Sequence, residues 1–253
     1  MKTEFTSRFN HLVWQDDFAG PTLDYSRWEC EVNAFGGGNN ELQIYTDHPR
    51  NVRTEDSLLI LEAHHGNSII SGTQRDYSSG RVRSKNRGDW RYGRFEIRAR
   101  LPKGRGIWPA IWMLPTDEAY GPWAASGEID IMEALGHEPD RIHGTLHYGD
   151  RWPNNTSDGS QTYKLESGDF SDAFHVFRLD WDEQGMRWYV DDMLYRETPA
   201  SQWFSASAPS PAPFDRSFHL ILNLAVGGNW PGNPDSSTRF PCRMEIDWVK
   251  VWQ

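Results

Sequence analysis

Three carboxylates stand close together in the stretch GEIDIME, residues 127–133. Glu128 and Asp130 alternate with isoleucines, which predicts a β-strand that carries both acids on one face. Glu133 follows one residue out of step, so a regular strand would place it on the opposite face. Such acids could perform acid–base and nucleophilic chemistry. They could also bind a hard cation such as Ca²⁺, or form a solvated strand face that meets Arg or Lys across the sheet.

Aromatic residues and histidines accompany these acids. Trp108, Trp112 and Trp123 come before them, and His143 and His147 follow on the next expected strand. The chain has 13 Trp among 253 residues, more than a β core alone usually requires, and we expect about half of them in the core. Indole rings suit the CH-rich faces of sugars. This setting favours catalysis on a carbohydrate over metal binding or a plain strand.

Cleavage of a glycosidic bond sets a geometric requirement. A retaining glycosidase needs two carboxyl groups roughly 5–5.5 Å apart. A regular strand would separate Glu128 and Glu133 by roughly 16 Å, on opposite faces. A β-bulge at Ile131 and Met132 would return Glu133 to the face of Glu128 and reduce the spacing to four strand steps or fewer, roughly 13 Å. Asp130 would then lie between them, and like charges this close raise at least one pKa.

Period-2 alternation recurs along the chain, and no segment keeps a helical pattern over twelve residues. The alternating runs cover 57–65, 79–86, 93–102, 127–135, 141–149, 174–181, 186–197, 218–226 and 242–253. A hairpin is expected to turn at Glu183-Gln184-Gly185. Many short strands with Gly- and Pro-bearing connections predict an all-β sandwich or barrel of antiparallel sheets. Segment 201–215 is expected to be a surface loop, so we interpret residues 1–253 as a single domain.

Composition excludes some partners. A net charge of −10 argues against nucleic acid. The mean hydropathy is −0.74, and no apolar run is long enough to cross a membrane. The N-terminus MKTEFTSRFN lacks the apolar region of a signal peptide, so the protein is either intracellular or has lost its leader.

The chain has two cysteines, Cys30 and Cys242, whose spacing does not suit metal ligands. They either form a disulfide or remain free thiols.

The motif EIDIME resembles the E-x-D-x-x-E signature of glycoside hydrolase family 16, in its laminarinase-like form; lichenases carry the shorter E-x-D-x-E. Segments in the family order accompany it along nearly the whole chain, among them NNELQIYT, YGRFEIRARLP, GIWPAIWML, HGTLHYG, NLAVGGNWPG and IDWVKVW. The resemblance implies a β-jelly-roll sandwich of two antiparallel sheets with a substrate cleft on the concave face. It also implies retaining endo-hydrolysis of internal β-1,3 bonds in laminarin-type β-glucans, with no cofactor in catalysis, by a secreted monomer whose leader has been removed.

By position in the motif, Glu128 resembles the nucleophile of the family and Glu133 its general acid/base. Asp130 resembles the residue that orients the nucleophile and tunes its charge. His147 stands where the family often has a hydrogen-bonding group near the nucleophile, and a surface strand histidine is the alternative. His143 has the same parity as His147 and could face the same cleft.

Polar residues elsewhere are candidates for glucan binding. Arg81 and Arg83 share a strand face, and their planar donors suit vicinal sugar hydroxyls, although strand arginines are often simply solvated. Asn39 and Asn40 follow three glycines, and one of them resembles an asparagine that contacts the glycon side in the family.

Tryptophans are candidate sugar platforms. Trp108 and Trp112 share strand parity unless Pro109 disturbs it. Trp230 lies in the loop GGNWPG, where Gly and Pro favour exposure.

A structural Ca²⁺ on the convex side is common in the family that the chain resembles. Asp247 matches its aspartate ligand, and Asp17 and Glu62 fall near the positions whose carbonyl groups would complete the shell. The ion would stabilise the fold rather than catalyse. The alternative is an aspartate satisfied by an arginine.

Two departures from the family pattern concern specificity. Ala134 stands where many laminarinases have Asn, and Ser126 and Gly127 stand where some members carry an aromatic residue. We expect these positions to line the cleft. A mixed-linkage β-1,3/1,4-glucanase or another family 16 hydrolase or transglycosylase therefore stays an alternative, as does a non-catalytic glucan-recognition protein. Silent members lose one or both glutamates, whereas this chain retains both.

Overall fold

The computed structural model describes residues 8–159 and 161–253, and within them the regular secondary structure is almost entirely β-strand. Two short 3-10 helices occur, η1 (Gly36–Gly38) and η2 (Ala200–Gln202). No helix in the described part of the chain is long and apolar enough to span a membrane. Residues 1–7, which carry most of the stretch used to judge a leader, lie outside the described residues.

The outer sheet follows the order β17-β16-β15-β9-β19-β5-β6-β3, with β1 beside β19 and β4 beside β5. Its strands are β1 (Leu12–Asp16), β3 (Gln43–Tyr45), β4 (Val52–Glu55), β5 (Leu58–Ile70), β6 (Thr73–Ser79), β9 (Gly93–Arg100), β15 (His175–Asp182), β16 (Gly185–Val190), β17 (Met193–Pro199) and β19 (Cys242–Trp252).

The inner sheet follows the order β13-β12-β11-β10-β18-β7-β2, with β14 beside β12 and β8 beside β18. Its strands are β2 (Glu29–Cys30), β7 (Arg81–Arg83), β8 (Asp89–Trp90), β10 (Ile107–Pro115), β11 (Glu128–Glu133), β12 (Arg141–Tyr148), β13 (Thr156–Ser157), β14 (Gln161–Lys164) and β18 (Phe218–Val226).

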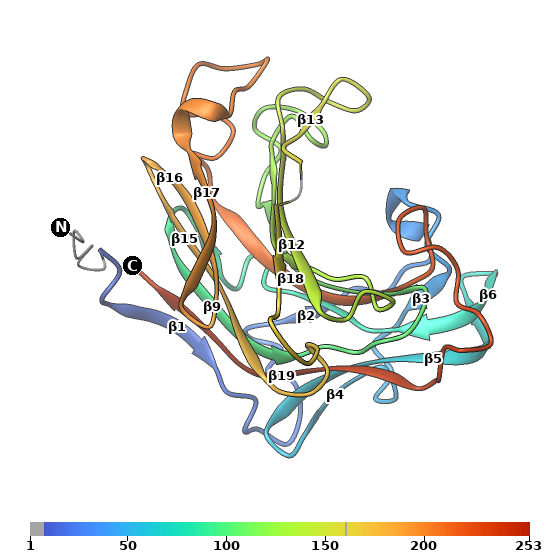
Figure 1. Ribbon diagram of the computed structural model, residues 1–253. Helices are drawn as coiled ribbons and strands as arrows, with labels where there is room; N and C mark the ends of the chain where they lie inside the picture. Colours follow the sequence, from blue (N-terminus) through green and yellow to red (C-terminus); the bar gives the residue numbers. More distant parts are fainter. Residues whose placement is uncertain (1–7, 160) are drawn as a thin grey trace.

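The two sheets stack and curve together, with β12 and β18 in one layer and β9 and β19 in the other (Figure 1). Pairs such as β10–β18 and β9–β19 are antiparallel, whereas β3 and β6 are parallel. The predicted sandwich of antiparallel sheets is therefore confirmed. The consecutive strands β11 and β12 are neighbours in the inner sheet, and β15 and β16 are neighbours in the outer sheet.

Alternation along the strands builds the core between the sheets. In β9, Phe95, Ile97 and Ala99 are fully buried, while Glu96 and Arg98 point outward, as the period-2 pattern predicts. Burying a side chain such as Phe or Ile contributes about 1.5–3 kcal/mol. One hydrophobic cluster of this kind extends across both sheets. The core therefore holds the inner sheet, and with it β11, in a defined position.

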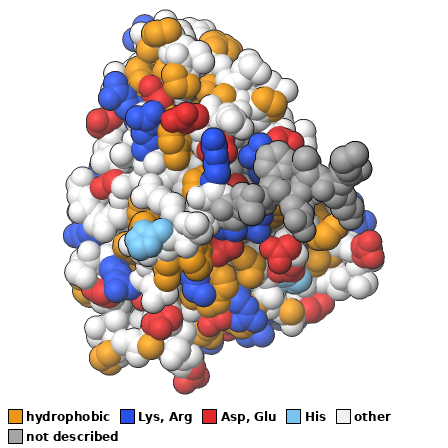
Figure 2. Space-filling view, turned by 90° about the vertical axis from the view of Figure 1, so that its left-hand side faces the viewer, with side chains coloured by type: hydrophobic (Ala, Val, Ile, Leu, Met, Phe, Trp, Pro, Cys, Tyr) orange, Lys and Arg blue, Asp and Glu red, His pale blue; other side chains and the backbone are white. Residues whose placement is uncertain are grey.

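Tryptophans divide between core and surface as expected. Six are buried: Trp28, Trp90, Trp108, Trp181, Trp188 and Trp203. Trp123, Trp152 and Trp230 are exposed large hydrophobic residues. Figure 2 shows acidic and basic side chains interspersed on one face of the molecule. The net negative charge is therefore not concentrated on that face.

The predicted hairpin, the loop 201–215 and the two cysteines can each be located in the structure. The hairpin is confirmed, because β15 ends at Asp182 and β16 begins at Gly185. Segment 201–215 is an irregular connection before β18, although Trp203 and Phe214 within it are buried. Cys30 and Cys242 are free thiols on strands of different sheets.

Candidate active site

Strand β11 contains the predicted bulge. Glu128 pairs with His147 of β12, and Glu133 pairs with His143, so five steps along β11 oppose four steps along β12. On the other side, Trp112 of β10 faces Asp130, and Ile111 faces Met132. One extra residue therefore stands in β11 against each neighbour. The bulge returns Glu133 to the face of Glu128, while Ile131 and Met132 remain buried.

The three acids line a cleft of about 760 Å³ on the inner sheet. Glu128 and Glu133 are partly buried, and Asp130 is 2% exposed. Residues of β7, β10, β12 and β18 contribute to the lining, together with the loops that contain η1 and Trp230. The bulge thus brings all three carboxyl groups into one cavity rather than onto two faces of the sheet.

Each glutamate accepts a hydrogen bond from a different indole. Trp123 donates its Nε1–H to Oε2 of Glu128 over 2.9 Å. Trp108 donates its Nε1–H to Oε1 of Glu133 over 3.1 Å. These donors fix the orientation of the two carboxyl groups and favour their ionised forms.

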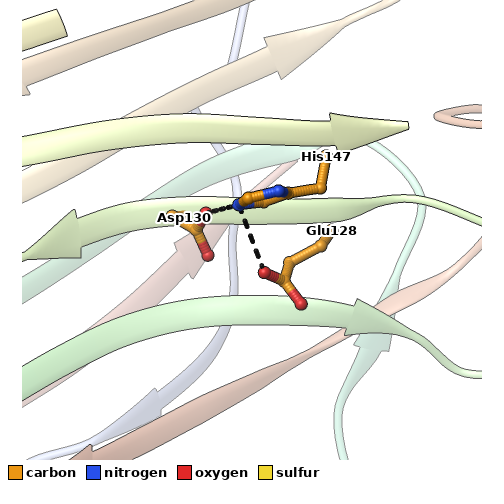
Figure 3. Close-up of side chains that lie close together, drawn as sticks. All are labelled: Glu128, Asp130 and His147. Carbon is orange, nitrogen blue, oxygen red and sulfur yellow. Dashed lines mark ion pairs between the residues drawn. The ribbon is translucent and has the colours of Figure 1, made fainter. Parts of the chain in front are cut away.

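His147 lies beside the carboxyl groups of Glu128 and Asp130 (Figure 3). Its Nε2 is 3.2 Å from Oδ2 of Asp130 and 3.6 Å from Oε1 of Glu128. Its Nδ1 is 2.8 Å from the hydroxyl of Ser157 in β13. The structure therefore places His147 beside the acid that resembles the nucleophile, rather than on an outer surface.

Burial raises the pKa of all three acids, and repulsion from neighbouring carboxylates raises those of Glu128 and Glu133 further. Burial raises the pKa of Glu128 to about 7, and the charge of Asp130 adds to this effect, while His147 and the Trp123 indole oppose it. Burial raises the pKa of Asp130, opposed by Arg196. Burial and then the charges of Asp130 and Glu128 hold the pKa of Glu133 well above its usual range. A carboxyl group in this site can therefore keep its proton near neutral pH, as a general acid must.

Most of the expected substrate-binding residues line this cleft: Asn39, Arg81, Trp108, Trp112, His147 and Trp230. Pro109 does not disturb β10, whose pairing with β18 is continuous. The Arg81 guanidinium lies 4.9 Å from the Trp112 ring centroid and forms an ion pair with Glu31. The Trp108 and Trp230 rings meet edge to face at 5.5 Å.

Three expected substrate-binding residues lie outside the cleft lining. Arg83 forms ion pairs with Glu29 and Glu31 beside β2. The Asn40 side chain donates to Asn229 and so joins two loops. His143 is 9% exposed and packs against the Trp230 ring at 5.1 Å, so it supports that ring instead of facing the cleft.

The expectation that Ser126, Gly127 and Ala134 line the cleft is wrong. Ser126 is buried and donates its hydroxyl to the Gly121 carbonyl. A Cβ at Gly127 would lie 2.8 Å from the Phe214 ring, so an aromatic residue has no room there. Ala134 belongs to the hydrophobic core. At these three positions the chain therefore differs from the family pattern in the packing beneath the site and not in the cleft lining.

Several residues of the cleft lining were not predicted from the sequence as substrate-binding residues. Phe35 and Trp152 are 67% and 69% exposed and belong to the lining, as does Glu41. Trp123 was noted only as a neighbour of the acids. Exposed aromatic residues in loops give no periodic signal. Their only sequence signal is an apolar ring among Gly, Asn and Pro.

A buried cation supports the site from the outer sheet. Arg196 is 2% exposed, binds the Asp158 carboxylate and donates to the Gly144 carbonyl. Its guanidinium lies 4.4 Å from the ring centroid of Trp188, whose indole donates to the backbone oxygen of Asp130. Arg196 therefore connects β17 to both β12 and the segment that carries Ser157.

Two of the three residues that the resemblance implies as calcium ligands, Asp247 and Glu62, bind other groups in the structure. The Asp247 carboxylate forms an ion pair with Arg98. The Glu62 carbonyl accepts a hydrogen bond from Asn51 at 2.8 Å, and its carboxylate binds two arginines. Asp17 is exposed. The Asp247 carboxylate and the Glu62 oxygens, which a hard cation would require, thus already bind amide or cationic donors. The observed arrangement is the alternative, an aspartate satisfied by an arginine.

The sequence matches the profile of glycosyl hydrolases family 16 over residues 36–250. Glucan endo-1,3-beta-glucosidase A1 of Niallia circulans is 43% identical over 96% of this chain, which spans 38% of that protein. A beta-glucanase of Rhodothermus marinus is 41% identical, covering 96% of this chain and 85% of that protein. The catalytic domain of an endo-1,3-beta-glucanase (laminarinase) from Thermotoga petrophila superposes with a TM-score of 0.86 at 38% identity, covering 96% and 97% of the two chains. The chain therefore belongs to glycosyl hydrolase family 16.

Proposed function

We propose that the protein hydrolyses internal β-1,3-glucosidic bonds of laminarin-type β-glucans with retention of configuration. The observation that carries this proposal is the bulge in β11, which places Glu133 on the face of Glu128 inside one cleft. The names of the relatives in Niallia and Thermotoga favour β-1,3-glucan as the substrate.

The two glutamates take different roles in this reaction. Ionised Glu128 attacks the anomeric carbon while Glu133 gives its proton to the departing glycosidic oxygen, which breaks the bond and leaves a glycosyl ester on Glu128. Glu133, now ionised, takes a proton from water, and the water oxygen then displaces Glu128. The elevated pKa of Glu133 suits the first step, because the group must be protonated to act as the acid.

The surrounding groups hold these acids in place. The Trp123 indole binds one oxygen of Glu128, and His147 lies beside the other. Asp130 lies next to His147 and raises the pKa of Glu128 through its charge. These contacts restrict the nucleophile to one orientation before substrate arrives.

The shape of the lining favours attack within a chain. The lining includes Phe35 and η1 as well as Trp152 and Gly159, in addition to the residues of the inner sheet. The exposed aromatic faces of Phe35 and Trp152 can contact sugar rings of a bound chain. A polymer could therefore lie across the sheet, as endo-hydrolysis requires.

A product profile tests this function. Laminarin, barley β-glucan and agarose are incubated with the protein, and the products are separated by chromatography. We expect a mixture of laminarin oligosaccharides early in the reaction, less product from barley β-glucan and none from agarose. Release of mostly glucose from laminarin would contradict endo action. The Glu133→Gln variant is the control, and near-normal turnover by this variant would contradict the proposed role of Glu133 in hydrolysis.

We further propose that the protein acts outside the cell and as a monomer. A β-glucan polymer is too large to enter an intact cell, so an endo-enzyme must meet it outside. Activity confined to the cytosolic fraction of the producing cells would contradict the location. Light scattering after size exclusion gives the mass in solution, and a mass near 58 kDa, twice the 29.2 kDa chain, would contradict the monomer.

A further inference from the structure

Glu128, Asp130 and His147 each place one potential ligand atom within 4.8 Å of the others. Nε2 of His147 is 3.2 Å from Asp130 Oδ2 and 3.6 Å from Glu128 Oε1, and Figure 3 shows both carboxyl groups beside the imidazole. Ligands at about 2.0–2.2 Å from a tetrahedral zinc ion lie roughly 3.3–3.6 Å from one another. The two separations from the imidazole nitrogen therefore match those of a metal site, and the three ligand atoms all lie within 4.8 Å of one another.

A second observation, independent of this spacing, also points to a cation as the ligand. Asp130 is 2% exposed, and its Oδ2 receives no hydrogen bond from the described residues. Within residues 8–159 and 161–253, no lysine or arginine forms an ion pair with Glu128 or Asp130; both pair only with His147. A buried carboxylate oxygen that accepts no hydrogen bond is costly, and of the described residues only a histidine pairs with these two acids. A bound cation would supply a partner for Oδ2 of Asp130.

The surrounding hydrogen bonds orient the three groups toward a common point. Trp123 binds Oε2 of Glu128, which leaves Oε1 on the side of His147. Nδ1 of His147 lies 2.8 Å from the Ser157 hydroxyl. When Nδ1–H donates to Ser157, Nε2 presents its lone pair to the carboxyl groups, as a metal-binding imidazole does.

We propose that Glu128, Asp130 and His147 bind a divalent transition-metal cation such as zinc, and that its binding inhibits hydrolysis. One imidazole nitrogen and two carboxylate oxygens suit zinc, with the fourth position open toward the cleft. Calcium prefers six to eight oxygen ligands and does not match this donor set. The inhibitory part rests on the proposed function, because a metal on Oε1 withdraws the nucleophile from the anomeric carbon.

Titration calorimetry on tag-free protein tests the site without any sugar. Zinc is added to the wild type, to His147→Gln and to His137→Gln, which removes an exposed histidine after β11. We expect one zinc per chain in the wild type and His137→Gln, and binding weaker by about tenfold or more in His147→Gln. Calcium is expected not to bind there. Absence of zinc binding to the wild type, or equal affinity in His147→Gln, would overturn the site.

A second variant and a second readout complete the test. Asp130→Asn keeps the shape of the side chain, and thermal melting shows whether each variant is folded; weakened zinc binding in a folded Asp130→Asn protein supports the site. Zinc is also expected to stop laminarin turnover until a chelator removes it. Zinc binding with unchanged turnover overturns the inhibition. Absence of turnover without zinc overturns the proposed function, while calorimetry still decides the metal site.

Discussion

Trp108 of β10 donates its indole N–H to Oε1 of Glu133 in β11 over 3.1 Å. This bond favours the ionised form of Glu133 and opposes the burial and the neighbouring charges that raise its pKa. A tryptophan of the cleft lining thus also limits how tightly Glu133 holds its proton.

Removal of this donor should widen the active pH range on its alkaline side. Trp108→Phe keeps an aromatic ring but loses the N–H, so the pKa of Glu133 rises further. Activity requires Glu133 to be protonated, and it declines as the pH rises through that pKa. The alkaline limb of kcat/KM against pH should therefore move to higher pH. An alkaline limb unchanged or moved to lower pH would contradict the role of Trp108.

The corresponding change at Trp123 should move the opposite limb. Its indole lowers the pKa of Glu128, which is about 7 in the intact site. Trp123→Phe removes the donor and raises this pKa, so a higher pH is needed to ionise the nucleophile. The acid limb of the same profile should move upward while the alkaline limb stays in place. If both tryptophan variants shifted the same limb, the two roles would be assigned wrongly.

The acid site should reduce stability at neutral pH. The folded-state pKa of Glu133 is raised above its unfolded value of about 4.3, so its favourable contribution is complete below that value and is lost as the pH rises through the folded pKa. Glu133→Gln cannot ionise, and its Tm at neutral pH should exceed that of the wild type by a few degrees. Calorimetry below about pH 4 should show the difference shrink. Glu118→Gln, at an exposed loop position, is the matched control.

Loss of Arg196 should weaken the fold and the site together. Arg196→Met keeps length and volume but leaves the Asp158 carboxylate and the Gly144 carbonyl without this donor. Breaking a fully buried pair costs about 3–5 kcal/mol, and because Asp158 is partly exposed we expect about 2–3 kcal/mol from chemical denaturation. Arg187→Met, which breaks a more exposed pair with Glu197, should cost less than about 1 kcal/mol. Equal losses in the two variants would contradict the special position of Arg196.

Local patterns predicted the strands and the acid face well, because both depend on alternation against a single core. The bulge was also predictable, since Glu133 can reach Glu128 only if one residue is accommodated between them. Arg81 and Arg83 show where this reasoning stops. They share a strand face, yet Glu29 of β2 and Glu31 just after it pair with Arg83, which lies outside the cleft lining. Which neighbour a strand residue meets depends on sheet order, and alternation does not encode it.

Loop contacts were the second source of error. His143 has the parity of His147, but the loop that carries Trp230 folds over it. Trp123 reaches back to Glu128 from an irregular segment, where no period predicts direction. Asp247 matched a calcium ligand by position in the motif, and Arg98 on the adjacent strand takes its charge. The partners of His143 and Asp247 are distant in sequence, whereas Trp123 lies five residues from Glu128 but on a segment without a periodic pattern.

The central claim is that Glu128 attacks the anomeric carbon while Glu133 serves as acid and base. It is tested most directly by trapping the covalent intermediate with a 2-deoxy-2-fluoro laminaribioside that carries a good leaving group, followed by peptide mass spectrometry. The predicted result is one glycosyl group per chain, attached to Glu128, with loss of activity in proportion to labelling. Attachment to Glu133 or Asp130, or continued laminarin turnover by fully labelled protein, would contradict the account.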